Sequence, residues 1–216
     1  MWTFDEKRFS VFSESLRKPL KKELSKLYAG ARERGIPVID EETMDILSFL
    51  LSVKKPERIL EIGSAIGFSA AFIINFAEPS AALTSIEYND AMADEAEENW
   101  KKLGILERIR FIRGDAVSVI KDEKKPYDFI FLDSAKGQYP MMLPDLKRLL
   151  KKGGILFSDN VSMEGRVMES RFFVERRDRT IHERIRSFLW EVSKDPDFQT
   201  DLLPLGDGIL LALKLV

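Results

Sequence analysis

The sequence predicts an α/β fold: a mostly parallel, seven-stranded sheet with helices on both faces and a helical N-terminal extension. Three observations support this prediction. After residue 55, short apolar runs alternate with segments of helical composition, which is typical of parallel strands joined by right-handed crossovers. The C-terminal part instead holds two apolar runs separated by a short glycine-rich turn, which predicts an antiparallel hairpin. The first 53 residues look wholly helical.

Five short runs rich in Ile, Phe and Leu predict the parallel strands. Each run ends in glycine or an acidic residue, as buried strands of such sheets commonly do. The runs cover residues 58–63, 82–87, 108–114, 127–133 and 153–159. Helices are expected between them at 67–77, 89–104, 115–122 and 139–152. Gly104 and Gly153 stand where two of these helices are expected to stop.

The two ends of the chain complete the predicted domain. A charged helix is expected at about 170–194, followed by a hairpin that turns at Gly206–Asp207–Gly208. Near the N-terminus, Asp40 is a plausible N-cap, and Pro19 is expected to separate or kink the first two helices. Because no repeat, low-complexity tract or linker is visible, we predict one domain over residues 1–216, with residues 1–53 as a helical lid.

The composition excludes several classes of protein. The chain has no cysteine, which excludes disulfides, thiol nucleophiles and thiolate metal sites. No apolar run reaches the roughly 20 residues that span a bilayer, and the N-terminus lacks a signal pattern, so we expect a cytoplasmic protein without a membrane partner. The net charge of −2 argues against indiscriminate nucleic-acid binding. Basic residues nevertheless cluster in 1–34 and 169–186, either as solvated helix faces or as local binding patches.

A glycine-containing turn predicts a ligand site after the first strand. The segment ILEIGSAIGFSA places Gly63 and Gly67 where that strand is expected to turn into a helix. Glycine lets the backbone approach a ligand closely, although a tight turn without a ligand gives the same pattern. Glu87 ends the second strand roughly 20 residues beyond Gly63, where it can accept hydrogen bonds from ribose hydroxyls. Asp115 follows the third strand, where it can accept one from an adenine amino group.

The glycine spacing indicates which ligand is expected. The pattern from Glu61 to Gly67, E-x-G-x-x-x-G, differs from the G-x-G-x-x-G of pyrophosphate-binding folds, and there is no P-loop lysine. An adenosine ligand without phosphates fits better, and S-adenosylmethionine (SAM) is the common one. In this respect the sequence resembles the class I methyltransferases, whose Rossmann-like parallel sheet also ends in an antiparallel hairpin.

Three oxygen donors follow the fourth and fifth predicted strands. Asp133 ends the fourth strand, and Asp159 and Asn160 end the fifth. Neighbouring parallel strands bring these side chains to one rim beside the cofactor site. A single aspartate at such a position is more often a cap or turn residue. Two carboxylates and one amide oxygen together suit Mg²⁺ or another divalent cation.

Lys136 stands three residues after Asp133 and is expected to face the same substrate. Repulsion from a neighbouring cation lowers the proton affinity of an ammonium group. Lys136 can therefore act as a general base towards a hydroxyl whose acidity the metal has raised, and the resulting oxyanion would attack the sulfonium methyl group in line. The alternative is a surface salt-bridge partner.

This arrangement resembles the catechol and caffeoyl-CoA type O-methyltransferases, which use a divalent metal to methylate one of two vicinal oxygens. The resemblance covers nearly the whole chain, through EIGSAIGFS, IEYND, GDA, FLDSAKGQY, LFSDNV and LGDGIL. It implies a commonly homodimeric enzyme, with Asp133, Asp159 and Asn160 as metal ligands and Lys136 as the base. It also implies a cofactor site made of Val38, Glu61, Gly63, Gly67, Ser69, Glu87, Asp115, Ala116 and Asp133.

The substrate is predicted from the segment around Lys136. Small-molecule members of this family usually read Asp-x-Asp-Lys, then an acidic residue or Asn, then Tyr, whereas this chain has DSAKGQY. That segment resembles a bacterial branch that converts 5-hydroxyuridine at the tRNA wobble position to 5-methoxyuridine. O5 and O4 of this base are adjacent, so they can chelate Mg²⁺ as a catechol does, and the wobble base lies in a single-stranded loop from which it can be splayed out.

Two alternatives to the tRNA prediction stay open. The first is a catechol or hydroxycinnamoyl-CoA O-methyltransferase that uses the same machinery on a small molecule. The second is a non-catalytic module that binds adenosine or RNA.

A tRNA anticodon loop as partner would explain the basic segments 1–34 and 169–186, which would bind its phosphates. The expected phosphate contacts are Arg32, Arg34, Arg171, Arg176 and Arg177. Phe172 and Phe173 could stack on bases, although apolar aromatic residues on a helix more often belong to the core. His182 is expected at the surface of a charged helix, and Trp2, Trp100 and Trp190 are expected to be packing residues.

Overall fold

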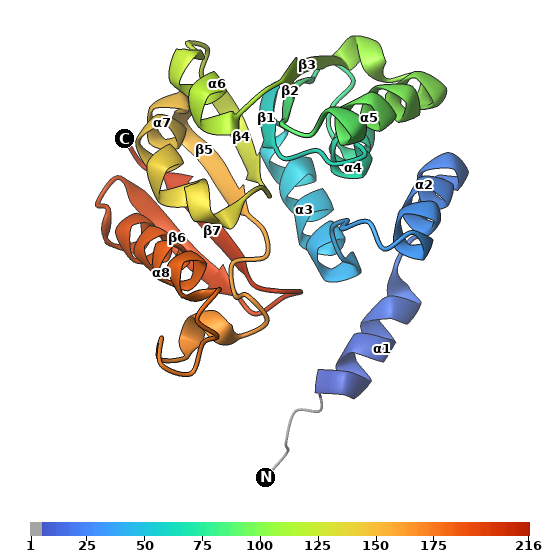
Figure 1. Ribbon diagram of the computed structural model, residues 1–216. Helices are drawn as coiled ribbons and strands as arrows, with labels where there is room; N and C mark the ends of the chain where they lie inside the picture. The colour runs from blue at the N-terminus through green and yellow to red at the C-terminus, as the bar shows by residue number, and fades with distance from the viewer. Residues whose placement is uncertain (1–5) are drawn as a thin grey trace.

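The computed structural model of the chain contains one seven-stranded sheet in the order β3-β2-β1-β4-β5-β7-β6 (Figure 1). The structure describes residues 6–216. The strands are β1 Arg58–Ile62, β2 Ala82–Glu87, β3 Ile109–Arg113, β4 Tyr127–Leu132, β5 Leu150–Ser158, β6 Phe198–Leu203 and β7 Ile209–Lys214. Strands β1 to β5 pair in parallel, and β7 pairs antiparallel with both β5 and β6. The predicted sheet and its C-terminal hairpin are confirmed.

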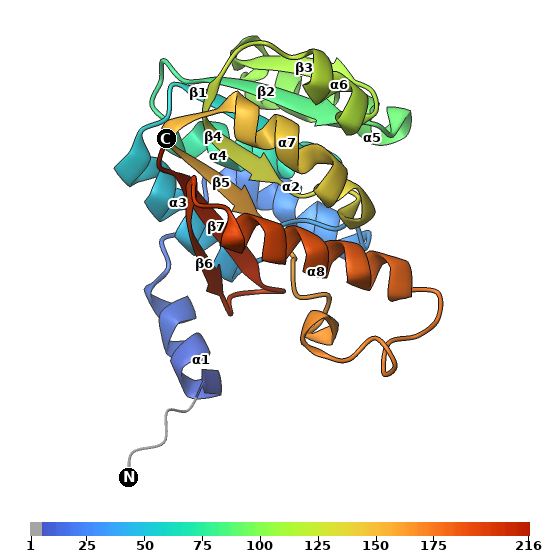
Figure 2. The same ribbon diagram turned by 90° about the vertical axis from the view of Figure 1, so that its left-hand side faces the viewer.

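Helices cover both faces of this sheet (Figure 2). One face carries α6, α7 and α8, and the other carries α2, α3, α4 and α5. The α-helices are α1 Glu6–Leu16, α2 Lys22–Glu33, α3 Glu41–Lys54, α4 Phe68–Phe76, α5 Asp90–Leu103, α6 Ala116–Asp122, α7 Tyr139–Leu149 and α8 Arg179–Lys194. Short 3₁₀ turns lie at η1 Leu106–Arg108, η2 Lys136–Gln138 and η3 Arg166–Met168.

Three of the four residues predicted to cap, end or separate helices are found where expected, and one is not. The Asp40 carboxylate accepts a hydrogen bond from the Thr43 N–H at 2.7 Å and so caps α3. Gly104 ends α5 with φ +68°, and Pro19 lies between α1 and α2. The prediction for Gly153 was wrong, because α7 ends before it and the residue lies inside β5. Its φ of +71° accompanies a register shift between β4 and β5, and glycine is the residue that tolerates this conformation.

The last helix begins later than the sequence predicts, at residue 179 instead of about 170. The preceding segment, 161–178, is an irregular excursion that leads from the end of β5 to α8 (Figure 2). Phe172 and Phe173 therefore lie outside the helix and are 80% and 81% exposed, which excludes them from the core.

Within α8, the surface and core positions also differ from expectation. His182 is buried, because it shares the face of the helix that Ile185, Phe188 and Val192 turn towards the sheet. Trp190 is 68% exposed and is not a packing residue. Trp100 is buried as expected, whereas Trp2 lies outside the described residues.

Helix α1 projects away from the body of the molecule (Figures 1 and 2). Val11, Phe12 and Leu16 on it are exposed. The following Arg17 ties this part of the chain to α3 through ion pairs with Glu41 at 2.5 Å and Asp45 at 2.6 Å. Across residues 6–216 no helix combines the length and apolarity needed to cross a membrane.

Candidate active site

A cavity of about 670 Å³ opens at the carboxyl ends of β1, β2 and β4. This is the edge at which open α/β sheets bind ligands. Most of the predicted cofactor residues line it, namely Val38, Gly63, Ser69, Glu87, Asp115, Ala116 and Asp133. Lys136 and Asn160 line the same cavity, so the structure brings the predicted base and two of the three predicted metal ligands, Asp133 and Asn160, together with the predicted cofactor residues. From the N-terminal segment, residues 37–39 border it.

Gly63 and Gly67 have different reasons to be glycine. Gly63 has φ +93°, and a Cβ there would lie 2.0 Å from the carbonyl oxygen of Asp133. Only glycine lets the ends of β1 and β4 approach this closely. Gly67 has φ +82°, and its Cβ would meet the Trp100 ring, whose Nε1 donates to the Gly67 carbonyl at 2.8 Å. Gly67 therefore packs α4 against α5 and is not among the residues that line the cavity.

Glu61 lies buried beneath the cavity floor. Its carboxylate accepts hydrogen bonds from the hydroxyls of Ser69 at 2.6 Å and Ser85 at 2.5 Å. Burial raises the pKa of Glu61 to about 7, even though both serines oppose the shift. Because Ser69 lines the cavity, Glu61 orients a cavity residue from below.

The raised pKa of Glu61 predicts a pH-dependent stability. Between pH 4.5 and about 7 the folded protein binds more protons at this carboxyl than the unfolded chain does, so the free energy of unfolding falls as pH rises. The free energy of unfolding of the wild type relative to Glu61→Gln is expected to fall by about 3 kcal/mol over this range. Urea unfolding of both proteins at several pH values measures it, with Glu107→Gln at an exposed position as the control. A constant difference would contradict the prediction.

The two acids that follow β2 and β3 are held in place by local hydrogen bonds. Glu87 accepts from the backbone N–H groups of Ala65 at 2.9 Å and Asn89 at 2.8 Å. Asp115 caps α6 by accepting from both the N–H and the hydroxyl of Ser118 at 3.0 Å. Donation by the Ser118 N–H lowers the pKa of Asp115, which keeps this carboxylate ionised.

Gln138 is a cavity residue that the sequence analysis did not assign to the site. Its side-chain amide donates to Asp115 Oδ1 at 3.0 Å. Gln138 belongs to the same 3₁₀ turn as Lys136, so this contact joins the predicted base to the predicted adenine-binding acid. Its position two residues after Lys136 in DSAKGQY is the signal that could have identified it.

Asp133, Asp159 and Asn160 meet as predicted. The Asn160 side chain lies beside Asp133 and opposes the rise in the pKa of that carboxyl. Asp159 Oδ1 accepts from the Thr43 hydroxyl at 3.2 Å and from the Asn160 N–H at 2.9 Å. Asp159 Oδ2 is buried, and it has no hydrogen-bond partner among the described residues. Lys136 Nζ lies 4.0 Å from Asp133 Oδ1.

The electrostatics of this cluster fit a bound cation. Burial raises the pKa of Asp159 to about 7, and repulsion from Asp133 adds to the shift. Burial likewise raises the pKa of Asp133, although Lys136 opposes this. Two carboxylates that repel each other, with one orphaned buried oxygen, are what a divalent ion would stabilise. In residues 6–216 no group of three or more His, Cys, Asp or Glu side chains could hold a metal, so the third ligand would have to be the Asn160 amide.

The arginines predicted to bind RNA have different environments. Arg32 lies in the last turn of α2, stacked over Tyr28, and Arg34 forms two hydrogen bonds with Glu95 at 2.5 and 2.8 Å. Arg171 pairs with Glu183 at 2.5 Å, and Arg177 with Glu175 at 3.0 Å. Arg176 is exposed, and it forms no hydrogen bond or ion pair with another described side chain.

Comparison with known proteins gives consistent matches over this chain. A family model described as O-methyltransferase matches residues 10–215. Tapetum-specific methyltransferase 1 of Arabidopsis thaliana is 31% identical over 206 residues, which cover 93% of this chain and 87% of the relative. A catechol O-methyltransferase of Niastella koreensis is 25% identical over 143 residues, covering 63% of this chain and 65% of the relative. The crystal structure of SAH-bound methyltransferase PaMTH1 of Podospora anserina matches with a TM-score of 0.86 and 25% identity, covering 100% of this chain and 99% of that one.

Proposed function

This chain belongs to the O-methyltransferase family, and we propose that it methylates 5-hydroxyuridine at the wobble position of tRNA, giving 5-methoxyuridine. The family match, the SAH-bound neighbour and relatives named as caffeoyl-CoA and catechol O-methyltransferases establish a SAM-dependent O-methyltransferase of the caffeoyl-CoA and catechol type. A non-catalytic binding module is therefore set aside. What the proposal adds is the nature of the acceptor oxygen and the metal that assists its methylation.

We propose that Asp133, Asp159 and Asn160 hold Mg²⁺ or another divalent cation. The unpartnered buried oxygen of Asp159 supports this assignment. When bound, such an ion supplies positive charge that lowers the pKa of an adjacent hydroxyl. Lys136 Nζ, 4.0 Å from Asp133 Oδ1, then takes the hydroxyl proton. The substrate oxygen forms a bond to the methyl carbon while the carbon–sulfur bond breaks, which leaves S-adenosylhomocysteine.

The tRNA assignment rests on one observation: the DSAKGQY segment and an irregular segment that exposes aromatic and basic side chains both adjoin the cavity. The excursion 161–178 begins directly after Asn160, which lines the cavity. At its other end, Arg184 of α8 donates to the Gly137 carbonyl at 2.9 Å, beside Lys136. Phe172 and Phe173 are exposed on this excursion. Exposed aromatic rings and exposed arginines near a pocket suit a splayed single-stranded base and its phosphates.

The competing substrate is a small-molecule catechol, which the name of the Niastella relative favours. The two substrates are separated by incubating the enzyme with labelled SAM and Mg²⁺, together with either undermodified tRNA carrying 5-hydroxyuridine or a catechol. Label is expected in the tRNA and, after nuclease digestion, in 5-methoxyuridine. Label in the catechol alone would overturn the tRNA proposal and leave the O-methyltransferase assignment intact.

Neutralising Arg176 and Arg177 is expected to weaken tRNA binding. Each lost phosphate contact reduces the slope of log K against log salt concentration by about 1. The slope for Arg176→Ala/Arg177→Ala is measured by filter binding or fluorescence anisotropy at several salt concentrations. Lys124→Ala/Lys125→Ala is the matched control. These exposed lysines precede β4, so they lie at the amino ends of the strands, away from the cavity at the carboxyl ends. Equal slopes for the wild type and the arginine variant would place the RNA elsewhere.

We also propose a homodimer in which α1 packs against a second copy of the chain. An isolated helix of about this length is marginal in water, and Phe12 and Leu16 are exposed on it. Phe49 and Val53 expose further apolar surface on α3. Sedimentation equilibrium is expected to give twice the chain mass for the wild type and a monomer for Phe12→Asp/Leu16→Asp. A monomeric wild type would contradict the proposal.

A further inference from the structure

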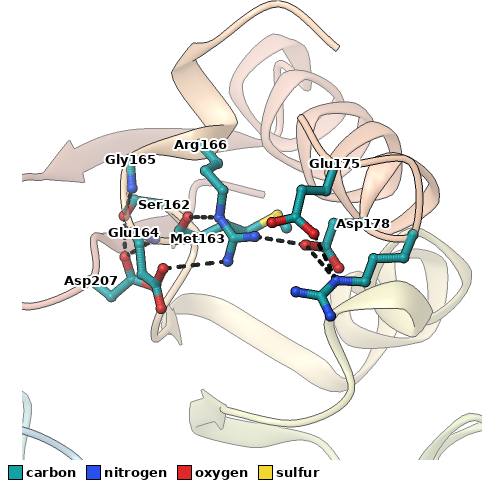
Figure 3. Close-up of polar contacts among 9 residues, drawn as sticks. Ser162, Met163, Glu164, Gly165, Arg166, Glu175, Asp178 and Asp207 are labelled. Atoms are coloured by element: carbon teal, nitrogen blue, oxygen red, sulfur yellow. Dashed lines mark hydrogen bonds and ion pairs between the residues drawn. The ribbon is translucent and has the colours of Figure 1, made fainter. Parts of the chain in front are cut away.

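The loop that follows Asn160 is bound to the tip of the C-terminal hairpin. The Val161 N–H donates to the Gly208 carbonyl at 3.0 Å, and the Ser162 N–H donates to the Asp207 carbonyl at 2.8 Å. The Asp207 carboxylate accepts a second set of hydrogen bonds, from the Ser162 hydroxyl and from the Glu164 N–H (Figure 3). Both of these donors reach the same oxygen, Oδ1. The residues next to a proposed metal ligand are thus held by a side chain 45 positions away from Ser162.

This loop needs support because its backbone is strained. Met163 and Glu164 have φ values of +54° and +57°, and Gly165 follows with +82°. Asn160 itself has φ +54°. Non-glycine residues rarely adopt this left-handed conformation and persist in it only where the surrounding structure holds them. The hydrogen bonds to Asp207 supply that support from one side.

Arg166 supports the loop from the other side. Its guanidinium donates to the Met163 carbonyl at 3.0 Å and to the Asp178 carboxylate at 2.7 Å (Figure 3). The strained residues therefore lie between the hairpin tip and the segment that precedes α8.

The hairpin tip also contacts the helix that supports Asp159. The Gly206 N–H donates to the Glu42 carboxylate at 2.8 Å, and the neighbouring Thr43 on α3 donates its hydroxyl to Asp159. A Cβ on Gly206 would meet the Asp40 carboxylate at 2.0 Å, so the tip and α3 are in close contact. The turn at residues 206–208 therefore contacts both the helix that hydrogen-bonds to Asp159 and the loop that follows Asn160.

We propose that Asp207 is a positioning residue for the metal site: by holding residues 162–165 in their strained conformation, its carboxylate fixes the orientation of the Asn160 side chain. Asp207 does not line the cavity and acts through the loop. This inference rests on the proposed metal site. It predicts that loss of Asp207 weakens metal binding while cofactor binding is unchanged, because none of the predicted cofactor residues belongs to the loop after Asn160 or to the hairpin tip.

The test compares Mn²⁺ binding to four proteins with S-adenosylhomocysteine present, by electron paramagnetic resonance of the free ion. Asp207→Ala is expected to bind Mn²⁺ about 10–100-fold more weakly than the wild type, the range typical of residues that orient metal ligands. Asp207→Asn is expected to stay close to the wild type, since one amide oxygen can accept both hydrogen bonds. Asp201→Ala, an exposed carboxylate on β6 of the same hairpin, is the control for removal of negative charge.

Two further measurements complete the test. S-adenosylhomocysteine affinity is expected to be equal in all four proteins. Amide hydrogen exchange at residues 163–166 is expected to be faster in Asp207→Ala with or without metal. Should this variant fail to fold, Ser162→Ala removes one of the two hydrogen bonds and is expected to show a smaller loss of Mn²⁺ affinity.

The outcomes separate this inference from the function on which it rests. No Mn²⁺ binding by the wild type would overturn the metal site itself, and the positioning role with it. Normal Mn²⁺ binding by Asp207→Ala would overturn only the positioning role. Equal losses in Asp207→Ala and Asp207→Asn would assign the effect to charge and would also overturn it.

Discussion

Asp133→Ala is expected to lower kcat/KM for methyl transfer by about a thousandfold or more. The change removes one of two carboxylates from the proposed metal site and the group that faces Lys136. The wild type is expected to lose activity in EDTA and regain it with Mg²⁺, whereas the variant gains nothing from added metal. Initial rates of labelled methyl transfer, with and without EDTA, measure both effects.

The same substitution is expected to leave the fold intact. The Asp133 backbone N–H donates to the Ile62 carbonyl at 3.0 Å, and alanine keeps that hydrogen bond. Burial raises the pKa of Asp133 above its value in the unfolded chain, so the ionised carboxylate destabilises the metal-free protein at neutral pH. Asp133→Ala should therefore melt no earlier than the wild type in EDTA. Full activity in this variant would end the metal assignment, whereas early melting would show that the side chain is needed for folding.

Lys136→Ala is expected to reduce kcat by about 10²–10⁴-fold, the usual contribution of a positioned general base. Cofactor affinity should change little, because Gly63, Glu87 and Asp115 lie on other strand ends and keep their environments. Single-turnover rates and isothermal titration with S-adenosylhomocysteine separate the two quantities. Lys152→Ala, an exposed lysine on β5, is the control.

Lys136→Arg distinguishes a base from a simple positive charge. Arginine keeps the charge but stays protonated at any accessible pH, so it cannot accept the hydroxyl proton. The arginine variant is therefore expected to be about as inactive as the alanine variant. Wild-type rates with arginine would show that position 136 needs only a cation, and an unchanged kcat with alanine would remove Lys136 from the mechanism.

The parts of the site predicted from sequence are those that depend on where a strand ends. Gly63, Glu87, Asp115 and Asp133 each follow an apolar run, and the structure brings all four to one cavity. A buried parallel strand is apolar along its length and becomes polar where it leaves the sheet. That change is visible in a few consecutive residues, so no knowledge of distant contacts is needed.

The wrong predictions concern segments whose local composition fits more than one structure. Residues 170–178 are charged like the helix that follows them, yet they form turns and leave Phe172 and Phe173 exposed. His182 was assigned to the surface because its neighbours in sequence are charged. His182 is buried because it lies on the face of α8 that packs against the sheet. The composition of the helix does not reveal which face that is.

The sequence alone predicts the succession of strands and helices along the chain, the strand ends that line the cavity and the resemblance to metal-dependent O-methyltransferases. The local succession of apolar and polar residues carries this information. The pairing of charged and polar groups needed the tertiary structure: Arg34 meets Glu95 across 61 positions, and Thr43 meets Asp159 across 116. Such contacts depend on which surfaces packing brings within hydrogen-bonding distance. The unpartnered oxygen of Asp159 and the hydrogen bonds between Asp207 and the loop after Asn160 arise in the same way.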